Sequence, residues 1–165
     1  SLVLVGVELG VVQGPFLVQA EDMGAGVGNA VIPGGPATRG DGYFQGLSVQ
    51  ASWFLTGEVR PYVRREGIFG QVRPRTNFRT RRNAAEHRTE RGFGAWELAT
   101  RYSRLDLNSE GIRGGDLHDF TIGLNWYLNP QVRVLWNHVL IWRNAANPGS
   151  SGFAQAFTMR CQLEF

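Results

Sequence analysis

A two-residue alternation between apolar and polar side chains is the feature that most constrains how this chain can fold. It is cleanest over Phe120–Asn129, where every second residue is large and apolar. Successive side chains of a β-strand point to opposite faces, so the pattern predicts strands with one apolar and one polar face. No uninterrupted apolar run reaches about 18 residues, which excludes a transmembrane helix but leaves membrane strands of about 9–11 residues possible.

The alternation recurs in seven segments, which we expect to form an all-β, antiparallel fold. These segments are Leu2–Val12, Phe16–Met23, Tyr43–Gly57, Phe93–Leu107, Phe120–Asn129, Gln131–Arg143 and Phe153–Phe165. A phase slip near Leu105 predicts a β-bulge.

The connections between these segments alternate in length. Gln13–Pro15 and Leu128–Pro130 allow only tight turns, because Gly, Asn and Pro favour abrupt reversals. Longer, Gly-rich or Asn-rich loops are predicted at Gly24–Gly42, Asn108–Gly115 and Asn144–Gly152. One connection, Glu58–Gly92, is long where a short one is expected.

Two architectures fit an alternating β pattern: a soluble sandwich or lipocalin-like barrel, and an outer-membrane barrel. Three features favour the membrane barrel. The polar faces carry charged residues such as Glu97, Arg101 and Arg133 beside small ones, as a wet lumen requires. Aromatic residues such as Trp53 gather near strand ends, as in interfacial girdles. The chain also ends on an aromatic residue, Phe165, after an alternating strand.

Four motifs resemble those of the phosphate-selective porin O/P family. They are Ser52–Tyr62 (SWFLTGEVRPY), Gly94–Leu107 (GAWELATRYSRLDL), Gly111–Gly115 (GIRGG) and Thr121–Pro130 (TIGLNWYLNP). The resemblance extends from about residue 43 to the end, and more loosely over Val7–Met23. It implies a larger barrel with an even number of strands, of which this chain would be the C-terminal half of about 16–18. It also implies a trimer, and a terminal Phe165 that belongs to the signal read by the barrel-assembly machinery.

Seven strands cannot close by themselves, because two unpaired edges in lipid would leave backbone groups unsatisfied. We therefore expect either strands preceding Ser1 or pairing with other copies of the chain. The whole chain, residues 1–165, is predicted to be one partial barrel in contact with outer-membrane lipids, with an arginine-rich connection at about 58–92.

Strand parity predicts an orientation. If the C-terminus is periplasmic, then the tight turns Gln13–Pro15 and Asn129–Pro130 are periplasmic too, and so is the long connection Glu58–Gly92. The three longer loops are then extracellular, which agrees with the usual arrangement of outer-membrane barrels.

Arginine supplies all 17 basic residues of the chain, and it is concentrated in the long connection. Arg64–Arg91 holds nine arginines against three glutamates. Clustered arginines give anion and phosphate pores their field, and guanidinium groups bind phosphate in a bidentate manner. We expect part of this connection to fold into the lumen, with inward arginines of the wall extending the anion path. The candidate residues are Arg64, Arg65, Arg73, Arg75, Arg79, Arg101, Arg133 and Arg160.

Other interpretations of these arginines remain open. A basic periplasmic loop can be solvated, can pair with Glu8, Glu97 or Glu164 across the lumen, or can bind anionic lipid headgroups. Thr80–Arg91 has the composition of a flexible basic spacer. The run Arg79–Arg82 has no nucleic-acid-binding fold around it, so we expect no nucleic-acid partner.

Other constellations of reactive residues are weak. His87, His118 and His138 lie on separate elements without ligand spacing, so we expect no metal site, and solvated carboxylates explain Asp116 and Asp119. Cys161 shares an apolar face and is expected to contact lipid. The glycine-rich Gly24–Gly35 lacks a following strand–helix unit, which argues against a nucleotide loop. Neither an enzyme nor a cofactor is predicted.

The expected function is therefore a passive diffusion channel in the outer membrane of a Gram-negative bacterium, biased towards phosphate-like anions. Two alternatives stand beside it: a structural barrel component that anchors a larger complex, and a soluble ligand-binding β domain.

Overall fold

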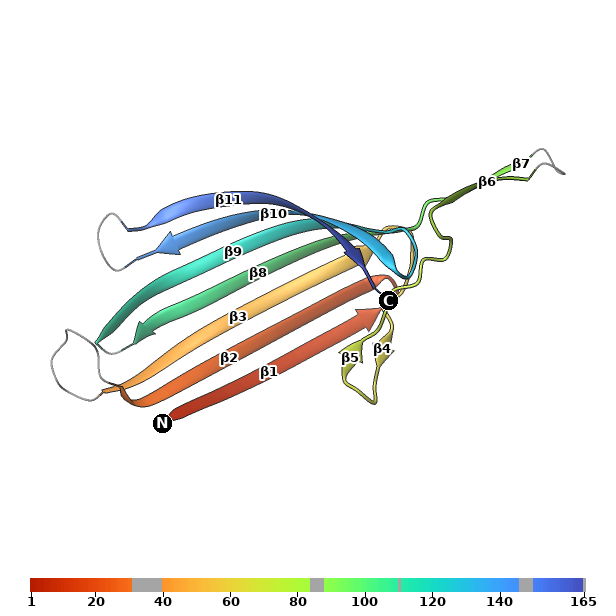
Figure 1. Cartoon of the computed structure of the whole chain (residues 1–165). Coiled ribbons are helices and arrows are strands. Elements are labelled where there is room, and N and C mark those ends of the chain that lie inside the picture. Colours follow the sequence, from red (N-terminus) through yellow and green to blue (C-terminus); the bar gives the residue numbers. More distant parts are fainter. Residues whose placement is uncertain (31–39, 84–87, 110, 146–149, 165) are drawn as a thin grey trace.

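The computed structural model describes residues 1–30, 40–83, 88–109, 111–145 and 150–164. Within them, seven strands form one antiparallel sheet in which each strand pairs with the next sheet strand along the chain (Figure 1). The strands are β1 (Leu2–Gln13), β2 (Phe16–Ala30), β3 (Gly40–Phe54), β8 (Ala95–Ser109), β9 (Ile112–Tyr127), β10 (Val132–Asn144) and β11 (Gly152–Leu163). Two hairpins lie in the connection between β3 and β8: β4 (Tyr62–Val63) with β5 (Ile68–Phe69), and β6 (Arg79–Asn83) with β7 (Arg88–Gly92).

The seven predicted strands are confirmed, and so is the irregularity near Leu105. The register of β8 and β9 shifts between Asp106 and Asn108, as expected for a β-bulge. Several boundaries were wrong because strands continue into segments whose Gly-rich or Asn-rich composition predicted loops. The segment predicted as the loop 24–42 is strand up to Ala30 and again from Gly40.

The predicted long loop Asn108–Gly115 was also wrong. Strand β8 runs to Ser109 and β9 begins at Ile112, so only residues 110 and 111 lie between them. Gly111 adopts a φ of 74°, a left-handed conformation that glycine reaches without steric cost. A reversal within two residues is therefore possible here, and the polar composition belongs to strand ends instead of a loop.

The connections gather at two ends of the sheet (Figure 1). We call one the turn end: it carries Gly14–Pro15, the whole β3–β8 connection, the β9–β10 turn and the end of β11. The other, which we call the loop end, carries the β2–β3, β8–β9 and β10–β11 connections. This division agrees with the grouping expected from strand parity. Phe165 itself lies outside the described residues.

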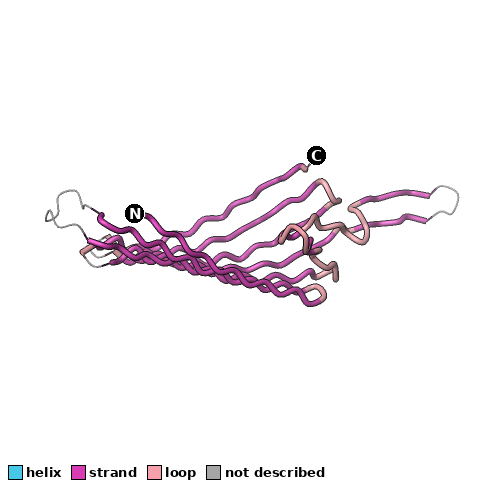
Figure 2. The backbone as a smooth tube through the Cα atoms, turned by 90° about the horizontal axis from the view of Figure 1, so that it is seen from below, coloured by secondary structure: helices cyan, strands magenta, loops and turns pink. Residues whose placement is uncertain are grey.

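The two hairpins of the β3–β8 connection follow different courses. The β6–β7 hairpin extends away from the sheet in both views (Figures 1 and 2), where a flexible spacer was expected. The β4–β5 hairpin lies against the sheet: a Cβ atom added at Gly10 of β1 would meet the Phe69 ring at 3.5 Å. Only the first part of the connection therefore contacts the polar face of the sheet.

Aromatic side chains mark both ends of the apolar face. Near the turn end, the Trp126 ring stacks on Trp96 at 5.1 Å between centroids, and the Trp136 ring lies parallel to Trp96 at 6.4 Å. Near the loop end, Trp142 packs against Phe153 at 5.5 Å. Between these two levels the same face exposes large apolar residues, for example Ile122 at 48%. This is the pattern of a lipid-facing wall between two interfacial girdles.

Among the described residues, β1 and β11 each have a partner strand on one side only, so the sheet is curved but not closed (Figure 2). The described part of the chain contains no helix long and apolar enough to cross a bilayer. Cys161 is exposed on the same face as Met159 and Leu163, as alternation predicts.

Candidate functional site

The inner, polar face of the sheet and the start of the β3–β8 connection together enclose a hollow of about 350 Å³. Alternation brings one side chain in two from each strand to this face. The register then sets Gln19, Gln50, Arg101 and Thr121 side by side across four strands. Arg60 and Phe69 of the connection complete the lining. The hollow is thus built jointly by the wall and by a segment that folds back onto it.

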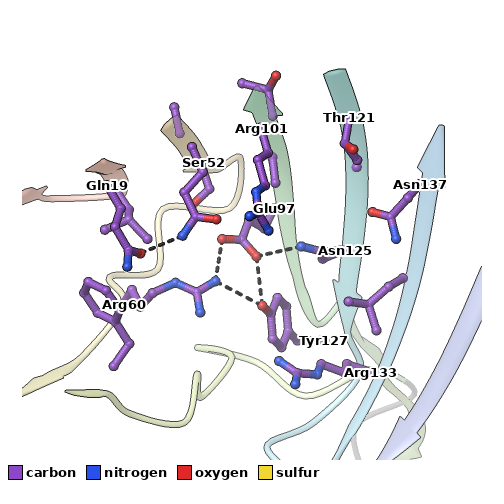
Figure 3. Close-up of a pocket in the computed structure, with 18 of the residues that line it drawn as sticks. Gln19, Ser52, Arg60, Glu97, Arg101, Thr121, Asn125, Tyr127, Arg133 and Asn137 are labelled. Atoms are coloured by element: carbon purple, nitrogen blue, oxygen red, sulfur yellow. Dashed lines mark hydrogen bonds and ion pairs between the residues drawn. The ribbon is translucent and has the colours of Figure 1, made fainter. Parts of the chain in front are cut away.

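An ion pair between Arg60 and Glu97 attaches this segment to the wall (Figure 3). The guanidinium Nη2 lies 2.5 Å from Glu97 Oε1 and donates to the Tyr127 hydroxyl at 3.2 Å. The other carboxylate oxygen accepts hydrogen bonds from Tyr127 at 2.8 Å and from the Asn125 amide at 2.9 Å. Glu97 is almost completely buried, at 1% exposure. Such a carboxylate is stable only because every oxygen has partners.

Burial opposes the charge of the Arg60 guanidinium, but its interactions with Tyr127 and Glu97 outweigh that effect and raise the pKa of Arg60 above its ordinary value. Arg60 therefore remains charged at any pH at which the protein is folded. The guanidinium also lies over the Phe54 ring, 5.5 Å from its centroid, which adds a cation–π contact.

The apolar residues beneath the attachment form a small core. Phe54, Val72, Ala95 and Tyr127 are all buried and belong to one cluster. Val72 comes from the connection and the other three from strand ends, so apolar burial and the ion pair fix the segment at the same place. Glu58, also buried, accepts a hydrogen bond from the Arg75 backbone at 3.1 Å.

A second set of interacting polar side chains lies at the turn end, beside the end of β11. Arg133 pairs with Glu164 at 3.1 Å and donates to the Gln162 side chain at 3.0 Å. The Gln71 amide of the connection donates to the Pro130 carbonyl at 2.6 Å. The connection thereby contacts the β9–β10 turn as well as β8.

The structure distributes the eight predicted arginines over several places. Arg101, Arg133 and Arg160 line the hollow described above. Arg64 lines a second hollow, between β1 and the β4–β5 hairpin, together with Glu8. The Arg75 guanidinium donates to the Gly57 carbonyl at 2.5 Å. The remaining three are exposed: Arg65, Arg73 and Arg79. Their role in a pore stays a prediction.

Arg60 was not among the predicted site residues because it lies outside the arginine-rich segment Arg64–Arg91. Its partner is 37 residues away along the chain, on a different element. The available signal was Glu97, a lone carboxylate on the inner face of a strand, which needs a cation when it is buried. Pairing of the long connection with inner acids was one of the open interpretations, and it occurs at Glu97, whereas Glu164 pairs with Arg133 of the wall.

The inner face is not uniformly basic. Farther from the turn end, the register sets Glu8 opposite Glu21, and Ser103 opposite Asp119 in the same cross-strand row. Glu8 accepts a hydrogen bond from Gln19. Among the described residues, no group of three His, Cys, Asp or Glu side chains has a geometry that could hold a metal ion.

A seven-stranded meander with an apolar aromatic-edged face, a polar inner face and an inward-folded connection is the wall of a membrane β-barrel. The chain belongs to the phosphate-selective porin O and P family, whose model matches residues 3–165. Members are non-enzymatic outer-membrane proteins of Gram-negative bacteria, so this chain is part of an outer-membrane porin.

The chain is also similar to an uncharacterized protein of Caulobacter vibrioides, with 31% identity over 109 residues. The aligned part covers 66% of this chain and 20% of that relative. The chain thus spans only about a fifth of the relative's length.

Proposed function

We propose that this chain forms part of the wall of a passive outer-membrane channel that favours phosphate-like anions. The observation that carries the proposal is the pair of inner arginines, Arg101 and Arg160, which line the hollow without an ion-pair partner among the described residues. Guanidinium groups in a narrow, partly desolvated passage attract anions and can bind phosphate oxygens through two N–H groups. Family membership supports the same reading.

In this proposal the anchored connection narrows the passage at the turn end. Arg60 is neutralised by Glu97 and positions the segment, whereas Arg133 pairs with Glu164 at the end of β11.

Closure of the barrel requires strands beyond the seven described, because both sheet edges would otherwise face lipid. We propose that they come from elsewhere in the full-length protein, and that the assembled porin is a trimer. Native mass spectrometry of the purified porin gives both the chain length and the subunit number.

Planar-bilayer recording of the full-length protein tests the channel proposal. In a gradient of potassium chloride, discrete channels should appear with a reversal potential of the sign that chloride permeation produces. Arg101→Gln combined with Arg160→Gln should move the reversal potential towards zero. Cation preference in the unaltered protein contradicts the arginine argument, and absence of channels contradicts the function itself.

A second candidate function, anchoring of a larger complex, is favoured by the β6–β7 hairpin. It projects beyond the wall, where it cannot line a passage (Figure 2). Removal of residues 79–92 should then release a co-purifying partner while the channels persist.

A further inference from the structure

The polarity of the two faces of the sheet reverses towards the loop end. On the outer face of β2, β3, β8 and β9, Asp22, Gln45, Arg104, Asp116 and His118 lie at or beyond the level of the Trp142–Phe153 contact, because Trp142 pairs with His118 in the register. Gln45 donates to Asp22 at 3.0 Å, while Arg104 pairs with Asp116 at 3.2 Å and Asp116 with His118 at 3.0 Å. Charged groups of this kind are costly in hydrocarbon, so this part of the wall begins at the interfacial edge of the apolar band.

At the same level the inner face is apolar on β2, β3, β8 and β9, and Arg143 of β10 adjoins it opposite Leu117. Register sets Met23 opposite Gly46, Gly46 opposite Leu105, and Leu105 opposite Leu117. Alternation places all four on the side that carries Glu97 and Arg101. We call these four residues the apolar strip. Its three side chains remain exposed, Met23 at 52%, Leu105 at 41% and Leu117 at 36%.

An apolar wall of this kind does not help a bare inorganic anion, because such an ion must keep its hydration until polar groups replace it. An apolar group on a solute gains from the same surface, since its burial against Met23 and Leu105 removes both from water. The strip therefore selects for an apolar group on the solute, whereas the arginines select for its negative charge.

Two residues of the strip, Met23 and Gly46, line a hollow of about 150 Å³ that also reaches Arg101. Leu47, Arg104, Ser103, Ser48 and Glu21 complete its lining, and Leu105 lies beside it opposite Gly46. Its volume is close to that of a cavity that accepts a benzene ring. Gly46 matters for this shape: a Cβ there would already contact Leu105 Cδ1 at 3.7 Å, so a larger side chain would fill the space above the strip.

We propose that the channel prefers organic anions with an aromatic or alkyl group, such as phosphate monoesters, over inorganic phosphate. The apolar group lies on the strip while the phosphate reaches Arg101. This substrate class rests on the proposed anion channel and narrows it. Glu21 in the same hollow offsets part of the Arg101 field, so a direct guanidinium contact, and not the long-range charge, holds the anion.

The test compares phenyl phosphate with inorganic phosphate as blockers of chloride current through the full-length protein. Phenyl phosphate should block at a concentration about tenfold lower, the order of discrimination that an apolar contact provides. Equal blocking concentrations of the two compounds contradict the proposed preference for organic phosphates but leave the proposed channel function intact. Absence of chloride channels overturns the proposed function instead.

Variants locate the effect. Met23→Ser with Leu105→Ser should bring the two blocking concentrations within about twofold, whereas Arg101→Gln should weaken both blockers alike. Val12→Ser is the matched control, because Val12 lies on the inner face of β1, away from the strip, and should leave the ratio unchanged. A ratio that survives in the strip variant overturns the site. If that double variant does not assemble, Met23→Gln alone should still lower the ratio.

Discussion

The two hairpins of the β3–β8 connection are close in sequence but are held in different ways. The β4–β5 hairpin follows an ion pair with a buried carboxylate, and its neighbour Val72 belongs to a buried cluster. The β6–β7 hairpin is attached at its base: Phe78 meets the Trp126 ring edge-on at 4.8 Å, and the Trp126 indole donates to the Phe93 carbonyl at 2.8 Å. Arginine content is therefore a poor guide to which segment enters the barrel, and apolar anchors are a better one.

The strongest test of this contrast is Glu97→Ala. The change leaves the Arg60 guanidinium partly buried without its carboxylate and removes an acceptor from Tyr127 and Asn125. Loss of one partner of a buried pair costs about 3–5 kcal/mol. Urea unfolding of the full-length protein in detergent, followed by tryptophan fluorescence, measures the loss.

The double change Arg60→Met with Glu97→Leu is the control for Glu97→Ala. It removes both charges together, so it should cost less than the single change. If Glu97→Ala costs under about 1 kcal/mol, the pair does not hold the segment.

A smaller effect is expected from Phe78→Ala. The aromatic contact with Trp126 contributes about 0.5–1.5 kcal/mol beyond the area it buries, and Phe78 is itself half-exposed. The base of the β6–β7 hairpin should loosen, so that trypsin cleaves after Arg79 or Arg91 several times faster while single-channel conductance stays the same. A change in single-channel conductance would show that the two hairpins are coupled.

Arg133→Gln should alter global stability by less than about 1 kcal/mol, because its pair with Glu164 is partly exposed to solvent. The same change removes a charge from the hollow, so its effect on reversal potential should exceed its effect on urea unfolding. The opposite ranking would assign Arg133 a structural role like that of Arg60.

The smallest effect is expected when residues 79–92 are replaced by a short Gly-Ser turn. Since the hairpin projects from the wall, unfolding free energy should change by no more than about 0.5 kcal/mol, and conductance should be unchanged. A lower conductance would contradict the separation between the two hairpins.

Alternation predicted the strands well because the two faces of each strand have different environments. In Phe120–Asn129, for example, large apolar residues alternate with polar or small ones accordingly. It failed at Asn108–Gly115, where the strands carry polar outward residues and the composition no longer distinguishes strand from loop. The Arg60–Glu97 contact could not be predicted from the sequence for another reason. It depends on how the connection between β3 and β8 folds back, and residues far apart in the sequence, such as Phe54 and Val72 of the buried cluster, fix that fold.

The row of three indoles at Trp126, Trp96 and Trp136 has an optical consequence. The planes of Trp126 and Trp136 lie within 15° of the Trp96 plane, and both centroids are close enough to that of Trp96 for excitation to pass between the rings. These rings come from β8, β9 and β10, so they come together only when the three strands are in register. The near-ultraviolet circular dichroism of the stack should therefore report strand registration during refolding, ahead of any electrical signal from an open pore.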